Sequence, residues 1–280
     1  MRTRIVTDTT ADIPSDLVAR YALTVVPVYI NVGDRSYLDD VELSRETFYE
    51  KLPHYEHHPT TSAPSLGTFV EAYEALAAEG AQEILSIHIA SSLSGVQNVA
   101  HAASQAIQSA RVTVFDSRQL TMGTGFLVLA AARAAEAGRS VAQILDVLQG
   151  MIHRVYSYAA PDTLEYLRRG GRLNRVQSSV GELLRIRPLL QMYQGDLTME
   201  RIRTSRRLLA RMEEIVQNLA PLENLALVHA NAKERAEGLW DRLSHHLPGA
   251  DAPLITEVTP AIGAHVGPGA LGLVCVEAGE

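Results

Sequence analysis

Hydrophobic residues in the first half of the chain fall into short strand-like runs separated by helical patterns. The runs are rich in Ile and Val, which favour strands; they lie at 5–6, 25–32, 84–89 and 112–115. The intervening segments carry apolar residues at helical spacing, most clearly at 65–79. Strands that alternate with helices are typical of a mainly parallel sheet flanked by helices. Residues 1–150 are therefore predicted to form an N-terminal α/β domain.

Residues 151–280 follow a different order, which predicts an α+β domain. Two strand patterns, 188–193 and 197–203, flank Gln194-Gly195-Asp196 and predict a hairpin. Further strands are expected at 156–160, 225–229, 255–258 and 273–276. Helices are expected at 163–168, 176–185, 205–219 and 233–247. The chain is thus predicted to be a two-domain α/β protein whose domain boundary lies near residue 150.

A hydroxyl-rich stretch, Pro59–Ser65, reads PTTSAPS and stands just before a predicted helix. Thr60, Thr61 and Ser62 are expected at the start of this helix, and Pro64 is expected inside its first turn. A helix start offers unpaired backbone N–H groups and the positive end of the helix dipole. We therefore interpret the stretch as a candidate seat for a carboxylate or a phosphate, with Ser62 as the helix cap.

A second hydroxyl cluster, Ser91–Gly95 (SSLSG), lies between the predicted strand 84–89 and a predicted helix. Ser and Thr are also preferred helix N-caps, so capping alone explains either cluster. Two such clusters at consecutive strand ends make an anion site and simple capping equally good interpretations. With Thr7–Thr10 and Asp116-Ser117, they are predicted to meet at the carboxyl edge of the sheet, where such folds bind ligands.

Other candidate motifs point away from catalysis and metal binding. The sequence contains no G-x-S-x-G, G-x-x-x-x-G-K-[ST] or H-E-x-x-H motif. Asp8 and Asp116 are better interpreted as turn caps than as acid–base groups. Gly267–Gly272 matches G-x-G-x-x-G, but it precedes a predicted strand instead of following one, which excludes a dinucleotide site. A solvated loop is favoured over a metal site for His54, His57 and His58.

Two basic segments and His265 each allow a ligand- or partner-binding interpretation and a purely structural one. Arg168, Arg169 and Arg172, around Gly170-Gly171, fit an anion clamp and a surface turn equally well. His265 is expected in a loop of small residues, where it either faces a ligand or has no special role. A further basic run is better interpreted as a solvated helix start than as a docking face; it comprises Arg201, Arg203, Arg206 and Arg207.

Composition and charge narrow the class of protein. Of the 280 residues, 46% are hydrophobic and 20% are charged, as in globular proteins with a sizeable core. The net charge of −7 argues against a broad nucleic-acid surface. The single cysteine, Cys275, excludes an internal disulfide and suits a reducing compartment. No apolar run reaches the ~20 residues of a membrane helix, and no signal-peptide pattern is found, so a soluble cytoplasmic protein is expected.

Together the motifs resemble those of the DegV family, bacterial fatty-acid-binding proteins that include the FakB subunits of fatty acid kinase. The resemblance spans residues 4–276 and rests on six segments: Thr7–Asp12, Pro59–Ser65, Ser91–Gly95, Asp116-Ser117, Gly170–Leu173 and His265–Gly269. It implies a DegV-like fold of two domains with one long-chain fatty acid in a tunnel between them. It also implies a lipid-binding protein that has no catalytic residue, cofactor or metal of its own.

The resemblance assigns a role to each matching position. The residues implied to bind the fatty-acid carboxylate are Thr61, Ser94, Ser62, Ser92 and His265. Two more are implied to lie near the head group, Arg172 and Gly95. Two positions depart from the family, because Ala63 stands where many members have Gln and Val96 stands where Thr is usual. Neither change removes a carboxylate donor, but both alter the hydrogen bonds available around the head group.

For partners, the resemblance implies a long-chain fatty acid and a fatty acid kinase. In FakB-type members, a separate kinase phosphorylates the bound carboxylate to an acyl phosphate, so the binding protein supplies the substrate. No nucleic acid and no stable membrane insertion are expected. The alternative is a stand-alone phosphotransferase or hydrolase acting on a small anionic substrate, which would turn over without a partner. A third interpretation is a lipid-sensing module, which would bind its partner only when loaded.

Overall fold

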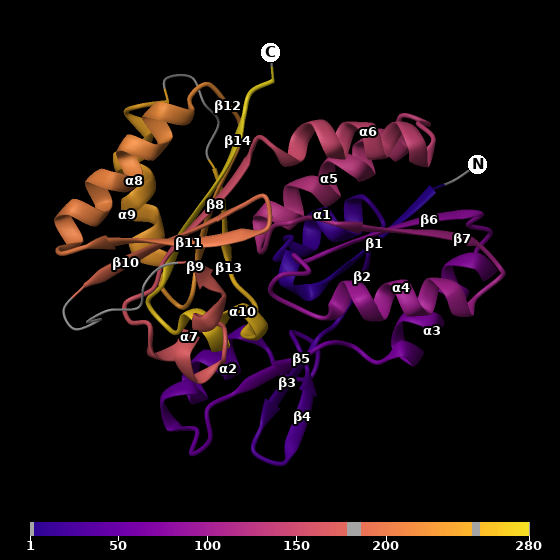
Figure 1. The fold of residues 1–280 in the computed structure, drawn as a ribbon, viewed down its shortest axis with the longest axis horizontal. Helices are drawn as coiled ribbons and strands as arrows, with labels where there is room; N and C mark the ends of the chain where they lie inside the picture. The colour runs from indigo at the N-terminus through magenta and orange to yellow at the C-terminus, as the bar shows by residue number, and fades with distance from the viewer. Residues whose placement is uncertain (1–2, 178–185, 248–252, 280) are drawn as a thin grey trace.

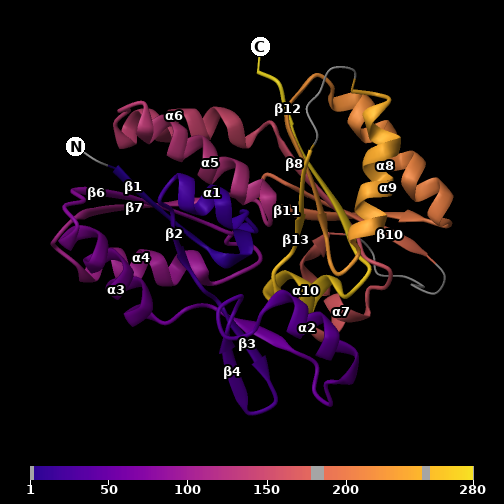
Figure 2. The same ribbon diagram turned by 180° about the vertical axis from the view of Figure 1, so that it is seen from behind.

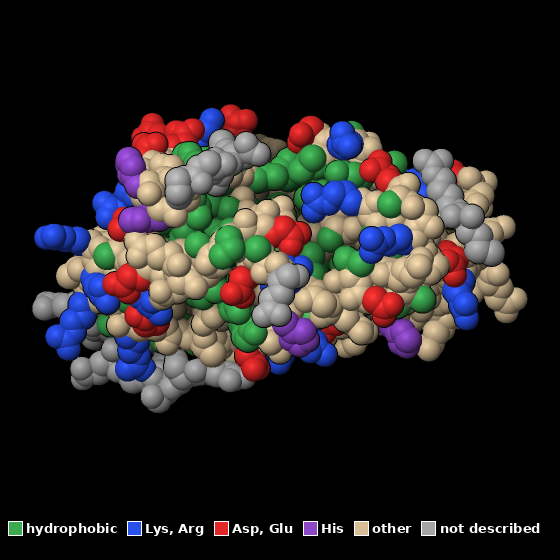
Figure 3. Space-filling view, turned by 90° about the horizontal axis from the view of Figure 1, so that it is seen from above, with side chains coloured by type: hydrophobic (Ala, Val, Ile, Leu, Met, Phe, Trp, Pro, Cys, Tyr) green, Lys and Arg blue, Asp and Glu red, His purple; other side chains and the backbone are tan. Residues whose placement is uncertain are grey.

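The computed structural model describes residues 3–177, 186–247 and 253–279, and the strands in these ranges form three sheets. Figures 1 and 2 show one small sheet and two larger sheets that lie on opposite sides of the molecule. Within the described ranges, no helix combines the length and the hydrophobicity needed to cross a membrane. On the face shown in Figure 3, acidic and basic side chains are interspersed and do not gather into a patch of one sign.

The first sheet is fully parallel, as the sequence predicts for the N-terminal half. Its strand order is β2-β1-β6-β7. The strands are β1 (Thr3–Asp8), β2 (Thr24–Val26), β6 (Glu83–His88) and β7 (Arg111–Asp116). Helices α3 and α4 cover one face of this sheet, and α5 and α6 cover the other (Figure 1). The helices of this half are α1 (Ser15–Arg20), α2 (Arg45–Lys51), α3 (Leu66–Ala78), α4 (Val96–Ala106), α5 (Met122–Glu136) and α6 (Val141–Ile152).

The predicted single strand at 25–32 is wrong, because Pro27 divides it. The sequence marks Pro27 as an edge position or a bulge, because proline lacks a backbone N–H for strand pairing. The chain therefore leaves the first sheet after β2 and starts a small antiparallel sheet of order β4-β3-β5. Its strands are β3 (Tyr29–Val32), β4 (Arg35–Leu38) and β5 (Thr60–Ser62).

The expected helix start at Thr60–Ser62 is also wrong, since these residues form the edge strand β5. Pairing with β3, about 30 residues earlier in the chain, supplies the backbone hydrogen bonds on one side of this strand. Helix α3 begins later, and Ser65 caps it by accepting a hydrogen bond from the N–H of Thr68 at 3.1 Å. Pro64 therefore precedes the cap and does not lie in the first turn. Ser62 is not the cap of this helix.

The second large sheet has the order β13-β12-β14-β8-β10-β11-β9 and is mostly antiparallel. Its strands are β8 (Val155–Ala160), β9 (Val176–Gln177), β10 (Arg187–Tyr193), β11 (Asp196–Ile202), β12 (Leu222–His229), β13 (Leu254–Glu257) and β14 (Leu271–Glu277). The predicted β10–β11 hairpin is confirmed. The predicted helix at 176–185 is wrong at its start, which forms β9, and its remainder lies outside the described residues.

Helices α8 (Ser205–Leu219) and α9 (Lys233–Ser244) cover the outer face of the second large sheet (Figure 1). The short helices α7 (Glu165–Arg169) and α10 (Pro260–Val266) lie at the junction of the three sheets (Figures 1 and 2). His265 therefore lies in a helix, and the expectation of a loop is wrong. Three 3₁₀ turns complete the described elements: Thr9–Ala11, Leu52–His54 and Leu173–Arg175.

The inner face of the second large sheet packs on the N-terminal half. One hydrophobic cluster contains Val6 and Ile87 from the first sheet together with Val228 and Val274 from the second. A separate cluster fills the space between the outer face and α8 and α9, with Met212 at its centre. The two sheets thus share one core at their interface, and the domain boundary near residue 150 stays a prediction.

Candidate binding site

A largely apolar cavity of about 280 Å³ lies between the inner face of the second large sheet and the loops of the N-terminal half. Its apolar walls come from both halves and include Val28, Leu93, Leu190, Met192, Val228 and Ile262. Small residues of the sheet, Ala159 and Gly272, lie opposite each other in paired strands and leave room above the sheet. The cavity can therefore take an apolar molecule.

One end of the cavity lies at the switch point of the first sheet. From β1 the chain continues to β2 on one side, while β6 pairs on the other side, so a crevice forms where β1 and β6 end. Thr10, from the loop after β1, and Ile89 and Ser94, from the loop after β6, line the cavity there. Ligands of parallel α/β sheets bind at this kind of position.

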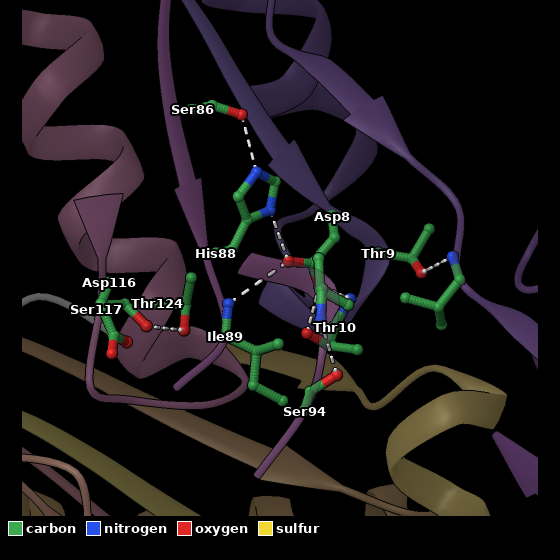
Figure 4. Close-up of polar contacts among 12 residues, drawn as sticks. Asp8, Thr9, Thr10, Ser86, His88, Ile89, Ser94, Asp116, Ser117 and Thr124 are labelled. Atoms are coloured by element: carbon green, nitrogen blue, oxygen red, sulfur yellow. Dashed lines mark hydrogen bonds and ion pairs between the residues drawn. The ribbon is translucent and has the colours of Figure 1, made fainter. Parts of the chain in front are cut away.

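One of the four predicted polar segments, Asp116-Ser117, does not reach the cavity. Asp116 is occupied by local contacts, because it accepts hydrogen bonds from the hydroxyl of Ser91 at 2.6 Å and from the N–H of Arg118 at 2.9 Å. Ser117 pairs with the hydroxyl of Thr124 at 2.9 Å (Figure 4). Neither Asp116 nor Ser117 is among the described residues that line the cavity. Asp116 thus acts as a turn cap, the interpretation favoured from the sequence.

Thr61 and His265 meet at the wall of the cavity. Thr61 comes from β5, where it pairs with Ile30 of β3, and His265 comes from α10. The hydroxyl of Thr61 lies 2.9 Å from Nε2 of His265. Both side chains line the cavity. The strand pairing and the helix therefore bring together two residues that the sequence analysis assigned to the same head group.

His265 is neutral in this environment. Burial of the ring lowers its pKa to about 3, and the charge of Arg172 and the nearby His58 ring act in the same direction. A neutral imidazole carries one N–H and one acceptor nitrogen. Nδ1 is buried without a hydrogen-bond partner among the described residues, and it lies so close to Gly170 that a Cβ there would overlap it. With the proton on Nε2, His265 donates to Thr61, and the hydroxyl hydrogen of Thr61 can turn to a ligand.

Arg172 gives this end of the cavity its positive charge. Its Nη1 donates to the carbonyl of Gly170 at 2.9 Å, and the guanidinium is about half-buried. Burial lowers the pKa of Arg172, and neighbouring Arg175 acts in the same direction. Arginine stays protonated at neutral pH despite such shifts. Among the described lining residues, Arg172 is the side chain that carries a full charge, so the cavity favours an anion at this end.

The remaining predicted site residues divide into two groups. Ser94 and Gly95 line the cavity at the start of α4, where the hydroxyl of Ser94 accepts a weak bond from the N–H of Val96 at 3.4 Å. Ser62 lines the exposed rim, and its hydroxyl accepts from Nδ2 of Asn31 at 3.3 Å. Ser92 is placed elsewhere. Its hydroxyl donates to a carbonyl in the turn of the β10–β11 hairpin at 2.7 Å, and it is not among the described lining residues.

A buried network organises the switch point from below the cavity. Asp8 accepts from Nδ1 of His88 at 2.9 Å and from the N–H and hydroxyl of Thr10 (Figure 4). Nε2 of His88 lies 2.7 Å from the hydroxyl of Ser86, which also accepts from Tyr73 at 2.8 Å. The order Asp–His–Ser resembles a hydrolase triad, but Ser86 is fully buried and outside the cavity lining. The network therefore positions Thr10 and does not present a nucleophile.

The sequence did not reveal five further polar residues of the cavity wall: Thr10, Thr121, Ser157, Tyr158 and His229. Thr10 lay inside a recognised motif but was not assigned to the site, whereas Thr121 and Ser157 belonged to no motif. Thr121 donates to Asp12 at 2.5 Å, and Ser157 donates to Oε1 of Gln119 at 2.8 Å. These residues face the cavity only because separate segments pack together, so no local pattern marks them.

The chain is similar to known proteins over nearly its whole length. Residues 2–278 match the model of the DegV family, which is described as a family of uncharacterised proteins. A DegV domain-containing protein of Streptomyces coelicolor is 38% identical over 275 residues, which cover 96% of each chain. A solved DegV family protein from Thermus thermophilus, described by its fatty acid binding, has a TM-score of 0.91 at 29% identity and covers 99% of this chain and 100% of its own. DegV of Bacillus subtilis, described as a fatty acid binding protein, has a TM-score of 0.88 at 31% identity and covers 99% of each chain.

Proposed function

The chain belongs to the DegV family, and we propose that its cavity binds one long-chain fatty acid. The observation that carries the proposal is the polarity of the cavity. Its walls are apolar, and its charged lining residue, Arg172, lies at the end where Thr61 and His265 meet. A fatty acid has the same distribution, with one anionic group at the end of an apolar chain. The relatives from Thermus thermophilus and Bacillus subtilis, described as fatty-acid-binding, support this assignment.

The energetics favour such a ligand. Each CH₂ group moved from water into an apolar site contributes about 0.8 kcal/mol, so a long acyl chain supplies a large part of the binding free energy. The carboxylate opposes binding unless donors replace its water, because an unpaired buried charge is very costly. The hydroxyls of Thr61 and Ser94 and the guanidinium of Arg172 can supply that replacement. We place the carboxylate between these three side chains.

We further propose that the protein presents the bound fatty acid to a fatty acid kinase. Ser62 and Gly95 are exposed and line the cavity, so the head-group end reaches the surface. Hydroxyl donors hold a carboxylate without a covalent bond, which leaves its oxygens available for phosphorylation by a second protein. The protein would then act as the substrate-binding partner, and the phosphoryl transfer would be done by the kinase.

The binding proposal is tested by chemical analysis of the purified protein. Denaturing extraction followed by mass spectrometry is expected to release about one equivalent of long-chain fatty acid. The delipidated protein is expected to rebind palmitate in a calorimetric titration. Extracts without acyl chains, together with no heat of binding on titration, would overturn the proposal.

The kinase proposal needs a separate assay. The loaded protein is mixed with radiolabelled ATP, with and without a bacterial fatty acid kinase catalytic subunit. Acyl phosphate is expected only when the kinase subunit is present. Formation of acyl phosphate by the loaded protein alone would contradict the assignment and would point instead to a stand-alone phosphotransferase.

A further inference from the structure

Helix α10, which carries His265, is held at its N-terminus by two carboxyl groups from the first 40 residues of the chain. The N–H of Thr259 donates to Oδ1 of Asp12 at 2.8 Å. The N–H of Ala261 donates to Oδ1 of Asp39 at 3.0 Å. Asp12 lies in the turn after β1, and Asp39 follows β4, so each bond joins segments more than 200 residues apart.

These bonds replace the usual local cap of the helix. The first N–H groups of a helix have no partner inside the helix, and the side chain of the N-cap residue commonly accepts from one of them. In α10 the N-cap residue is Thr259, and its side chain makes no such bond. The two Asp residues do this work from outside the helix, where a carboxylate also interacts favourably with the helix dipole.

Two further side chains of the N-terminal half hold the chain that leads into α10. The hydroxyl of Tyr49 donates to the carbonyl of Val258 at 3.1 Å. Nη1 of Arg45 donates to the carbonyl of Glu257. Tyr49 also packs against the helix so closely that a Cβ at Gly263 would lie 2.5 Å from its hydroxyl oxygen. The entry and the first turn of α10 are therefore fixed by side chains of the N-terminal half.

The two carboxyl groups are costly to keep in this position. Asp12 and Asp39 are fully buried, and burial raises their pKa values to about 6 and about 7. Arg45 partly offsets this cost at Asp12, while the charge of Asp12 further raises the pKa of Asp39. The other charged groups nearby are Asp40 and Glu257, both near Arg45. Neither Asp12 nor Asp39 is among the described residues lining the cavity, so binding does not use them directly.

The position of α10 determines the contact between His265 and Thr61. Ala261 and His265 are four residues apart, so they lie on one face of the helix, and both line the cavity. The 2.9 Å contact with Thr61 is lost as a hydrogen bond if the helix shifts the ring by more than about 0.6 Å, since such bonds weaken beyond ~3.5 Å. Loss of the hydrogen bond between the N–H of Ala261 and Asp39 is therefore expected to disturb the contact between His265 and Thr61.

We propose that Asp12 and Asp39 are positioning residues for the head-group site, which clamp the first turn of α10 and thereby keep His265 against Thr61. This inference rests on the proposed function only for the identity of the ligand. The clamp sets the affinity for a carboxylate head group, although its own carboxyl groups do not touch the ligand. Its effect on the acyl chain is smaller, because α10 contributes only Ala261, Ile262 and Val266 to an apolar wall that otherwise comes from strands and loops of both halves.

The test compares Asp39→Ala with Asp39→Asn in the delipidated protein. Alanine removes the acceptor for the N–H of Ala261, whereas the Asn side-chain oxygen keeps it. Palmitate affinity is expected to fall about tenfold in Asp39→Ala, which corresponds to ~1.4 kcal/mol. Asp39→Asn is expected to stay within about threefold of the unmodified protein. Affinity for palmitic acid methyl ester, which has the same chain but no charge, is expected to change less than twofold in both variants.

The methyl ester separates positioning from general damage to the cavity. Equal losses of palmitate and ester affinity in Asp39→Ala would overturn the proposal, because they would indicate a collapsed cavity. Unchanged palmitate affinity would overturn it as well. So would failure of Asp39→Asn to restore binding, since the acceptor and not the charge is assigned the positioning role.

A second measurement does not depend on any ligand. The ring resonances of His265 are assigned by NMR of ¹⁵N-histidine-labelled protein, with His265→Gln to identify them. Asp39→Ala is expected to shift these resonances in the ligand-free protein, whereas Asp39→Asn leaves them close to their original positions. Unshifted resonances in Asp39→Ala would overturn the clamp. If the unmodified protein bound no palmitate but the resonances shifted as expected, the clamp would stand and the proposed ligand would be wrong.

Discussion

Thr61 and His265 lie 2.9 Å apart although 204 residues separate them in the chain. The contact joins an edge strand of the small sheet to helix α10, which lies between strands β13 and β14 of the second large sheet. It therefore exists only when the three sheets are packed together, and it places a hydroxyl group at the charged end of an apolar cavity.

Removing the hydroxyl of Thr61 is expected to weaken fatty-acid binding. In Thr61→Val the shape of the side chain is kept, while the hydrogen bond to the carboxylate and the partner of His265 are lost. Palmitate binding is expected to weaken by ~1–3 kcal/mol, the usual cost of a lost bond to a charged group. Thr61→Ser, which keeps the hydroxyl, serves as the matched control. Equal affinities of Val and Ser variants in calorimetry would contradict the role of Thr61.

Ser94 and Ser92 are expected to affect different properties. Ser94→Ala is expected to weaken palmitate binding by ~1–3 kcal/mol, because Ser94 lines the cavity and is one of the three side chains between which we place the carboxylate. Ser92→Ala removes the bond to Gly195 and is expected to lower the free energy of unfolding by ~1 kcal/mol, with affinity changed less than twofold. Urea unfolding and palmitate titration of both variants check this. A binding defect in Ser92→Ala alone would reverse the assignment.

Adding one methyl group at Gly170 is expected to displace His265. The new Cβ would overlap Nδ1 of the ring, so Gly170→Ala is expected to weaken palmitate binding about tenfold and to reduce stability by ~1–3 kcal/mol. Gly150→Ala is the control, because Gly150 lies in α6 with open space around its Cα. That variant is expected to keep full affinity and to gain ~0.5–1 kcal/mol of stability. The same affinity in both variants would show that the ring does not need the space at Gly170.

The stability of the protein is expected to depend on pH through Asp39. Burial raises the folded-state pKa of Asp39 to about 7 from its ordinary value of 3.8. The unfolded chain therefore releases the proton of Asp39 at a lower pH than the folded protein, so the stability from this group falls as pH rises from about 4 to about 7.

Asp39→Asn removes this titration and isolates it from all others. The free energy of unfolding of the variant, minus that of the unmodified protein, is expected to increase with pH by up to about 1.4 kcal/mol per unit between pH 4 and 7. Above about pH 7 the difference is expected to be constant. Urea titrations at five pH values give this difference. A difference that stays level across the whole window would mean that Asp39 is ionised in the folded protein already at pH 5.

The sequence predicted those parts of the fold that depend on local patterns. The parallel sheet, the helix after Ser91–Gly95 and the β10–β11 hairpin all follow from periodicity and turn residues close in the chain. Strand β5 did not follow, because three residues carry little periodicity and this strand exists through its pairing with β3. Helix α10 did not follow either, since its small residues resemble a loop and its N-terminus is capped by distant carboxyl groups.

In the candidate site, too, residues in local motifs were predicted, and residues placed by the packing of distant segments were not. The motifs that resemble the DegV family contain the predicted residues that the structure brings to the cavity. Ser92 belongs to such a motif and yet points to the hairpin, which its position beside Ser94 could not reveal. Thr121 and Ser157 reach the wall through the packing of α5 against the second large sheet, and the apolar lining is spread over many strands. No short sequence motif therefore marks the apolar lining of the cavity.

The walls of the cavity come from both halves of the chain, so occupancy of the cavity affects the stability of the whole protein. A molecule that fills the cavity completes the core at the interface of the two large sheets. By mass action, such a molecule stabilises the folded state in proportion to the logarithm of its concentration over its Kd. The empty protein would then be the form that unfolds and is degraded first. Supply of the ligand would thereby regulate how much of the protein persists, without any change in its synthesis.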